Sequence, residues 1–104
     1  MEIITIRLRL EQLPEEIEKA EFDYQEHKAT LNHLEDLKKN VLAMEKVKFD
    51  GSNAERETQA YASQKYKSFV GSIKDLAIET AKKGALYHKK QNEFEAMRSL
   101  NKNI

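Results

Sequence analysis

The 104-residue chain contains no Cys and no Trp, a single Pro and only three Gly. Without cysteine it can form neither a disulfide nor a thiolate zinc site, and it has no cysteine nucleophile. The scarcity of proline and glycine leaves long stretches in which no residue interrupts a helix. The length suits one domain, so we predict a single helical domain over residues 1–104.

An excess of charge of one sign is also missing, because 18 Lys and Arg balance 18 Asp and Glu. A protein whose main task is to hold nucleic acid usually carries a basic excess. No apolar run approaches the ~20 residues of a membrane span, and no secretion signal opens the chain. We therefore expect no membrane partner and a location in the cytoplasm.

Two long segments carry apolar residues at helical spacing. Between residues 14 and 48, and again between residues 53 and 100, apolar side chains recur every three, four or seven positions. This periodicity predicts two long helices. They are separated by the turn formers of residues 49–52, and Ser52 followed by Glu55 is a capping box that begins the second helix.

The opening segment is treated separately because Pro14 disfavours helical geometry at Leu13. Residues 3–12 are predicted to form a short helix of their own. The alternation of Ile4, Ile6 and Leu8 with polar residues also fits a strand. No second alternating segment could pair with such a strand, so the helix is favoured and the strand stays open as an alternative.

The predicted fold is all-α: a long, coiled-coil-like antiparallel hairpin with a short N-terminal helix. Folding about residues 50–51 places Ile17 opposite Gly84 and Tyr24 opposite Leu76. Gly71 and Gly84 are expected where a neighbouring helix approaches closely or the helix bends mildly. The same fold lays the acidic residues 11–26 beside the lysine-rich residues 82–90.

Two helices alone cannot enclose both apolar stripes, so a homodimer forming a four-helix bundle is predicted. Coverage of the stripe by another protein is the alternative. The residues expected in the core and the dimer interface are Tyr24, Leu31, Leu34, Tyr66, Phe69 and Ile73.

Motifs for chemistry are missing. None of His27, His33 and His88 has the spacing of a helical metal site, and the serines lack a nucleophile-elbow motif. No glycine-rich phosphate loop is present. We predict no enzymatic activity, no catalytic residue, no cofactor and no metal. Residues 53–104 hold ten basic and six acidic residues, so weak contact with nucleic acid stays an alternative.

A partner-binding site is predicted near the end of the second helix. It consists of Phe94, Met97, Arg98 and Leu100, because aromatic, aliphatic and Arg side chains concentrate binding energy. Residues 3–10 either leave this group accessible or bury it as core. The opposite end, at the turn, is expected to offer little apolar surface.

Two resemblances bear on function. The Ala-Glu-Arg-Glu of residues 54–57, the stretch 60–66 and the Phe-Glu-Ala-Met-Arg-Ser-Leu of residues 94–100 resemble small helical-hairpin proteins of bacteriophage early regions. That resemblance covers about half of the chain. It implies a phage-encoded protein of the host cytoplasm, and proteins of this origin include antagonists of bacterial defence and neighbours of replication or recombination genes.

The turn also resembles the Trp-x-Gly family of small secreted hairpins, which dimerise into four-helix bundles. Phe49 stands where that family has Trp, and Gln91 stands four residues after Tyr87 where its secretion signal has an acid. The phage resemblance is ranked first, and from it we expect a non-enzymatic, phage-type interaction protein, an adaptor or inhibitor of a host or phage protein. The alternatives are a recombination or replication accessory and a secreted four-helix-bundle hairpin.

Overall fold

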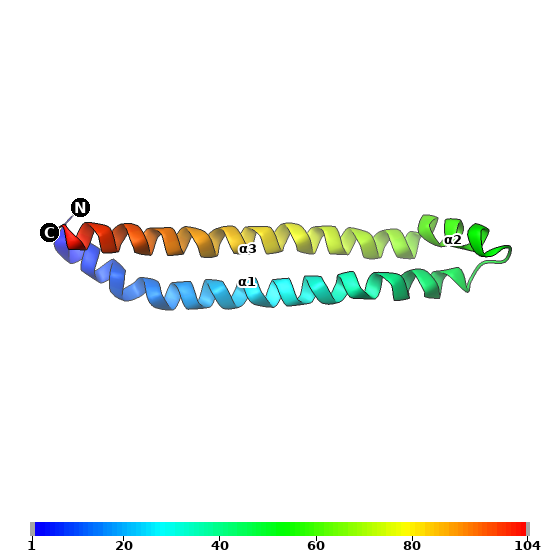
Figure 1. Cartoon of the computed structure of the whole chain (residues 1–104), viewed down its shortest axis with the longest axis horizontal. Helices are drawn as coiled ribbons and strands as arrows, with labels where there is room; N and C mark the ends of the chain where they lie inside the picture. Colours follow the sequence, from blue (N-terminus) through cyan, green and yellow to red (C-terminus); the bar gives the residue numbers. More distant parts are fainter. Residues whose placement is uncertain (1, 104) are drawn as a thin grey trace. The chain divides into compact units, whose positions relative to one another are not determined.

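The computed structural model describes residues 2–103. They form three α-helices: α1 (Ile3–Lys46), α2 (Asn53–Ala62) and α3 (Gln64–Lys102) (Figure 1). No strand occurs among residues 2–103. The prediction of an all-α chain is confirmed.

Packing divides the chain into two compact units. Unit 1 combines Met1–His27 with Thr80–Ile104, and unit 2 is Lys28–Glu79. Within each unit, a stretch of α1 runs antiparallel to a stretch of α3 (Figure 1). The hairpin pairing of the two long helices is therefore confirmed, whereas the single domain and the homodimer stay predictions.

The predicted separation of a short helix at 3–12 from a long helix at 14–48 is wrong, and so is the strand alternative. Helix α1 runs without interruption through Pro14. Ile6, Leu13 and Ala20, spaced by seven residues, are 2%, 0% and 5% exposed. Because this spacing keeps all three on one face of a continuous helix, their burial offsets the local cost of the proline.

Pro14 still affects the helix. A proline inside a helix removes one hydrogen bond and bends the axis, at a cost of ~3 kcal/mol. Pro14 itself is exposed. Figure 1 shows the blue N-terminal end of α1 sloping towards α3. The slope brings the first turns of α1 onto α3, which agrees with the burial of Ile6.

The turn of unit 2 is close to the predicted one. Helix α1 ends at Lys46, after which the amides of Lys48 and Phe49 donate to carbonyls three residues back at 3.1 and 3.2 Å. Gly51 has a φ of 117°, which favours glycine. The Ser52 hydroxyl accepts a hydrogen bond from the Glu55 amide at 3.2 Å. Ser52 is thus the N-cap, and the predicted start of the second helical segment is confirmed.

The predicted unbroken helix over 53–100 is wrong, because α2 and α3 are separated at Ser63. Ser63 has φ −65° and ψ 145°, outside helical geometry. Its hydroxyl donates to the Ala60 carbonyl at 2.7 Å and accepts from the Tyr66 amide at 3.2 Å. One side chain therefore caps the end of α2 and the start of α3, and α3 continues to Lys102.

The register of unit 1 differs from the predicted one at Gly84, which lies against Tyr24 rather than Ile17. A Cβ atom on Gly84 would lie 2.9 Å from Tyr24 Cε1. The close helix approach predicted for Gly84 is confirmed. It is absent at Gly71, where an added Cβ would meet nothing within 4 Å.

The buried core is sparse. Of the predicted core residues, Ile73 is buried at 6% exposure, and the other five are half-buried. Those five are Tyr24, Leu31, Leu34, Tyr66 and Phe69.

The expectation of little apolar surface at the turn is wrong, since Met44, Val47 and Tyr61 are 63%, 78% and 48% exposed.

Candidate protein-interaction surfaces

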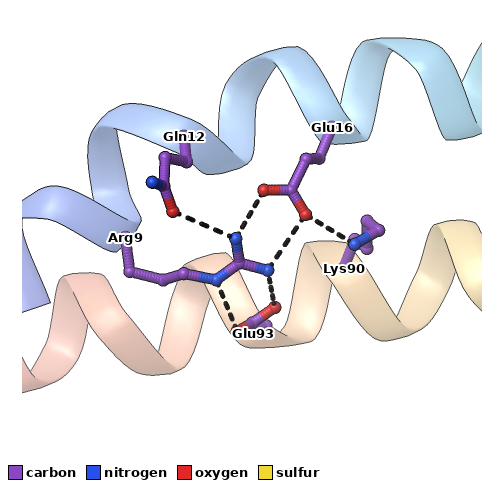
Figure 2. Close-up of polar contacts among 5 residues, drawn as sticks. All are labelled: Arg9, Gln12, Glu16, Lys90 and Glu93. Atoms are coloured by element: carbon purple, nitrogen blue, oxygen red, sulfur yellow. Dashed lines mark hydrogen bonds and ion pairs between the residues drawn. The ribbon is translucent and has the colours of Figure 1, made fainter. Parts of the chain in front are cut away.

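A cluster of charged side chains joins α1 to α3 in unit 1 (Figure 2). Arg9 Nε and Nη2 donate to the two carboxylate oxygens of Glu93 at 2.9 and 2.8 Å. Nη2 also donates to Glu16 Oε1 at 3.0 Å, and Nη1 pairs with Glu16 Oε2. A guanidinium that meets two carboxylates in this way fixes the orientation of all three groups.

Lys90 completes the cluster, since its Nζ donates to Glu16 Oε1 at 2.6 Å. Arg9 Nη1 further donates to Gln12 Oε1 at 3.5 Å. The four charged side chains retain between 22% and 34% of their exposure. The cluster holds two cations and two anions and is therefore neutral.

The contacts favour the ionised forms of Arg9, Glu16 and Glu93. Hydrogen bonds from Arg9, and then from Lys90, lower the pKa of Glu16 to about 2. The hydrogen bond from Arg9 also lowers the pKa of Glu93, and both carboxylates raise the pKa of Arg9.

Sequence reasoning found part of this cluster. The predicted proximity of the acidic residues 11–26 to the lysine-rich residues 82–90 is confirmed by the pair of Glu16 with Lys90. The pairing of Arg9 with Glu93 was missed. Arg9 and Glu16 lie seven residues apart and each follows a buried position by three, Ile6 and Leu13. That spacing was the available signal that both flank the helix seam.

Three adjoining hollows line one side of unit 1 around this cluster. The first and second share Arg9 and Glu93. The second and third share Leu86 and Lys90. Together they form one groove, the charged groove. Its lining residues are Thr5, Leu8, Arg9, Gln12, Glu16, Lys19, Ala20, Asp23, Leu86, Lys89, Lys90, Glu93 and Met97.

The charged groove is apolar at both ends and polar in the middle. Leu8 and Met97 line the first hollow, and Ala20 and Leu86 line the third. Leu8 is 52% and Leu86 is 43% exposed. Grooves between paired helices accept a further helix through side chains that interdigitate, so this groove is a candidate site for a helix of another chain.

A second hollow of unit 1, the Phe94 groove, is lined by Ile17, Gln91, Asn92, Phe94 and Glu95. Phe94 is half-buried, and the Arg98 guanidinium carbon lies 6.0 Å from the centre of its ring. Arg98 Nη1 donates to Glu95 Oε1 at 3.1 Å. An aromatic ring and a tethered guanidinium thus lie side by side at this surface.

The structure therefore divides the four residues predicted to bind a partner. Phe94 lines the Phe94 groove, and the Arg98 guanidinium lies next to its ring. Arg98 itself lines a neighbouring hollow with Glu95, Ser99 and Lys102. Met97 lines the charged groove instead, three residues further along α3. Leu100 is 44% exposed. The segment expected to cover the group is helical and buries Ile6, yet it leaves Arg98 and Leu100 exposed.

Tyr24 and Tyr87 pack at the seam between α1 and α3 in unit 1. The ring centre of Tyr24 lies 6.1 Å from that of Tyr87 and 6.2 Å from that of His88. The Tyr87 hydroxyl accepts a hydrogen bond from Gln91 Nε2 at 2.8 Å. These rings are part of the helix contact at Gly84.

Among residues 2–103, no group of three His, Asp or Glu side chains could hold a metal ion. No helix of that range is long and apolar enough to cross a membrane. His27 Nδ1 lies 2.8 Å from the Asp23 carbonyl oxygen, a contact within α1.

No model of a known protein family, no curated protein and no solved structure matches the chain. The two resemblances seen in the sequence stay predictions. Function must therefore be argued from the two grooves of unit 1.

Proposed function

We propose that this chain is a non-enzymatic protein-interaction protein of the phage type. In this role it is an adaptor or an inhibitor that binds a host or phage protein in the host cytoplasm, and antagonism of host defence is one form such inhibition takes. The observation that carries the proposal is the pairing of Phe94 with Arg98 at the surface of unit 1. Binding energy at protein interfaces concentrates in aromatic and Arg side chains of this kind.

The arrangement suits binding because it is already ordered. Phe94 is half-buried in its groove, and Glu95 holds the Arg98 guanidinium close to the ring. A partner that docks here pays less side-chain entropy than it would against two freely rotating side chains. The exposed face of Arg98 also leaves donors for a carboxylate or a carbonyl of the partner.

A protein partner is favoured over nucleic acid by the charges of unit 1. Lys90 and Arg9 are engaged with Glu16 and Glu93. These cations are neutralised within the chain, which reduces the positive surface that phosphates require. The nucleic-acid accessory is therefore the second candidate and the secreted hairpin the third.

The test is capture of partners from a phage-infected bacterial lysate, followed by titration of the purified partner. Arg98→Glu is expected to weaken binding by at least about tenfold, because it replaces a central contact with a repulsive charge. Lys67→Glu makes the same change of charge at an exposed position of α3 in unit 2 and is expected to bind as the wild type does. Circular dichroism checks that both variants fold.

A partner that binds wild type and Arg98→Glu equally would contradict the proposal, as would the lack of any partner specific to the wild type. Capture of nucleic acid, weakened by Arg98→Glu and abolished by salt, would instead support the recombination or replication accessory.

A further inference from the structure

The residue types that line the charged groove follow an order along the helix that can pair with the same order read in the opposite direction. On α3 the groove is lined by Leu86, Lys89, Lys90, Glu93 and Met97. Four of these, Leu86, Lys90, Glu93 and Met97, follow one another at intervals of three or four residues along one face of the helix. Read forwards, they are apolar, cationic, anionic and apolar. Read backwards, the two ends stay apolar and the two charges exchange places. A second copy laid antiparallel over this stretch would therefore place Leu86 opposite Met97 and Lys90 opposite Glu93.

Two charged residues on the α1 side of the groove fit the same reversal. Arg9 and Glu16 lie seven residues apart and carry opposite charges. A two-fold axis between them would place Arg9 of one copy opposite Glu16 of the other. The same two-fold axis applies to both helices, because the midpoint between Arg9 and Glu16 lies beside the midpoint between Lys90 and Glu93. Hydrogen bonds from Arg9 to Glu93 and from Lys90 to Glu16 hold the two pairs side by side in one cluster (Figure 2).

We propose that the charged groove is the interface of a homodimer. Two copies pack groove against groove about a two-fold axis through the cluster of Arg9, Glu16, Lys90 and Glu93. Such an interface is isologous, so each contact occurs twice. The α3 helices of the two copies run antiparallel across it, as do the two α1 helices.

Charge selects a second copy as the occupant. The cluster at the centre of the groove is neutral, and across the proposed axis each of its cations faces an anion of the other copy. A helix of another protein would need its own matching order of charges and apolar residues. The second copy carries that order by symmetry.

Exposed apolar side chains at the groove also favour such an interface. Leu8 and Leu86, at the two ends of the groove, are among the large apolar residues left exposed.

Disulfide trapping tests the proposed geometry of the dimer. Because the chain has no native cysteine, any disulfide must form between introduced cysteines. In the double variant Leu86→Cys/Met97→Cys the two thiols lie about 16 Å apart along one helix, too far to bond within a chain. Across the proposed axis they lie opposite each other. Mild oxidation is expected to give a covalent dimer with two disulfides. Leu86→Cys alone and Met97→Cys alone are expected to stay unlinked, because each thiol then faces a residue other than cysteine.

Sedimentation equilibrium tests the association itself. The wild type is expected to be a dimer at micromolar concentration, and Leu86→Asp is expected to raise the dissociation constant at least about tenfold, because it buries a charge in the interface. Phe22→Asp is the matched control, since Phe22 is 66% exposed and lines neither groove. It is expected to dimerise as the wild type does.

A wild-type monomer across the micromolar range would overturn the proposal. A dimer in which the double variant forms no more disulfide than the single variants would also overturn it, because association would then use another face. Neither result bears on partner binding at Arg98, which belongs to the Phe94 groove, so the two proposals fail separately.

Discussion

Units 1 and 2 are built from the same two long helices, yet their polar contacts differ in range. In unit 1 two ion pairs cross between the helices, Arg9 with Glu93 and Lys90 with Glu16, joining residues 84 and 74 positions apart in the chain. Unit 2 contains local ion pairs: Glu35 with Lys38 at 3.5 Å, and Glu45 with Lys48 at 2.5 Å. Long-range pairs select the register of two helices, whereas local pairs support single turns of one helix.

Glu45 illustrates the local character of unit 2. It is only 4% exposed, although it carries a carboxylate. A hydrogen bond from Lys48 lowers its pKa, and the Ser63 hydroxyl contributes a smaller lowering. Ser63 is the residue at which α2 ends and α3 begins. The buried charge of unit 2 therefore lies where the helices start and stop.

The apolar contacts differ as well. Unit 1 buries Ile6, Leu13 and Ala20 at intervals of seven, whereas unit 2 buries Ala60 and Ile73. Leu31 and Leu34 of unit 2 are half-buried. The comparison indicates that unit 1 has the better-packed seam, and the three predictions below test it.

The largest difference is expected for leucine truncations. Leu13→Ala is expected to lower the free energy of unfolding by about 3 kcal/mol, because it removes a side chain that is 0% exposed. Leu34→Ala, at a half-buried position of unit 2, is expected to cost about half as much. Urea unfolding followed by circular dichroism measures both. Equal losses would remove the distinction between the two seams.

Alanine at the two helical glycines is expected to have effects of opposite sign. Gly84→Ala places a Cβ 2.9 Å from Tyr24 Cε1, so the ring must move, at a cost of about 1–3 kcal/mol. Gly71→Ala meets nothing within 4 Å and is expected to stabilise α3 by up to about 1 kcal/mol. Thermal unfolding of the two variants gives the comparison. A stabilised Gly84→Ala would show that the close approach of the two helices does not hold in solution.

The smallest effect is expected for the pH dependence of unit 1. The pKa of Glu16 is about 2 in the folded chain against an ordinary 4.5. Between these values the unfolded chain binds more protons, so the contribution of Glu16 is complete above pH 4.5 and is lost as the pH falls towards 2. Glu16→Gln is expected to lower the melting temperature at pH 7 and to converge with the wild type near pH 2.

Glu18→Gln, at an exposed position of α1, is the control for the loss of one carboxylate. It is expected to follow the wild-type pH profile. If Glu16→Gln also kept the wild-type profile, the ion pairs across the seam of unit 1 would contribute nothing in solution.

Much of the local structure follows from residue types and spacing alone. Helical periodicity and the near absence of proline and glycine predict the two long helical segments, and the turn formers with Ser52 predict where they are joined. Phe94 and Arg98, which we propose bind a partner, were also predicted from their residue types. These features depend on neighbours within a few positions, which is the range over which a sequence pattern carries information.

Contacts between residues far apart in the sequence could be identified only from the tertiary structure. Helix α1 continues through Pro14 because Ile6 and Leu13 are buried on the same face of the helix. The stabilisation from that burial depends on α3, so it cannot be predicted from the residues next to the proline. The facing of Gly84 and Tyr24, and the reach of Arg9 to Glu93, depend on how α1 packs against α3 in unit 1. Periodicity places a residue on a face of its helix, but only packing of the second helix decides which residue it meets.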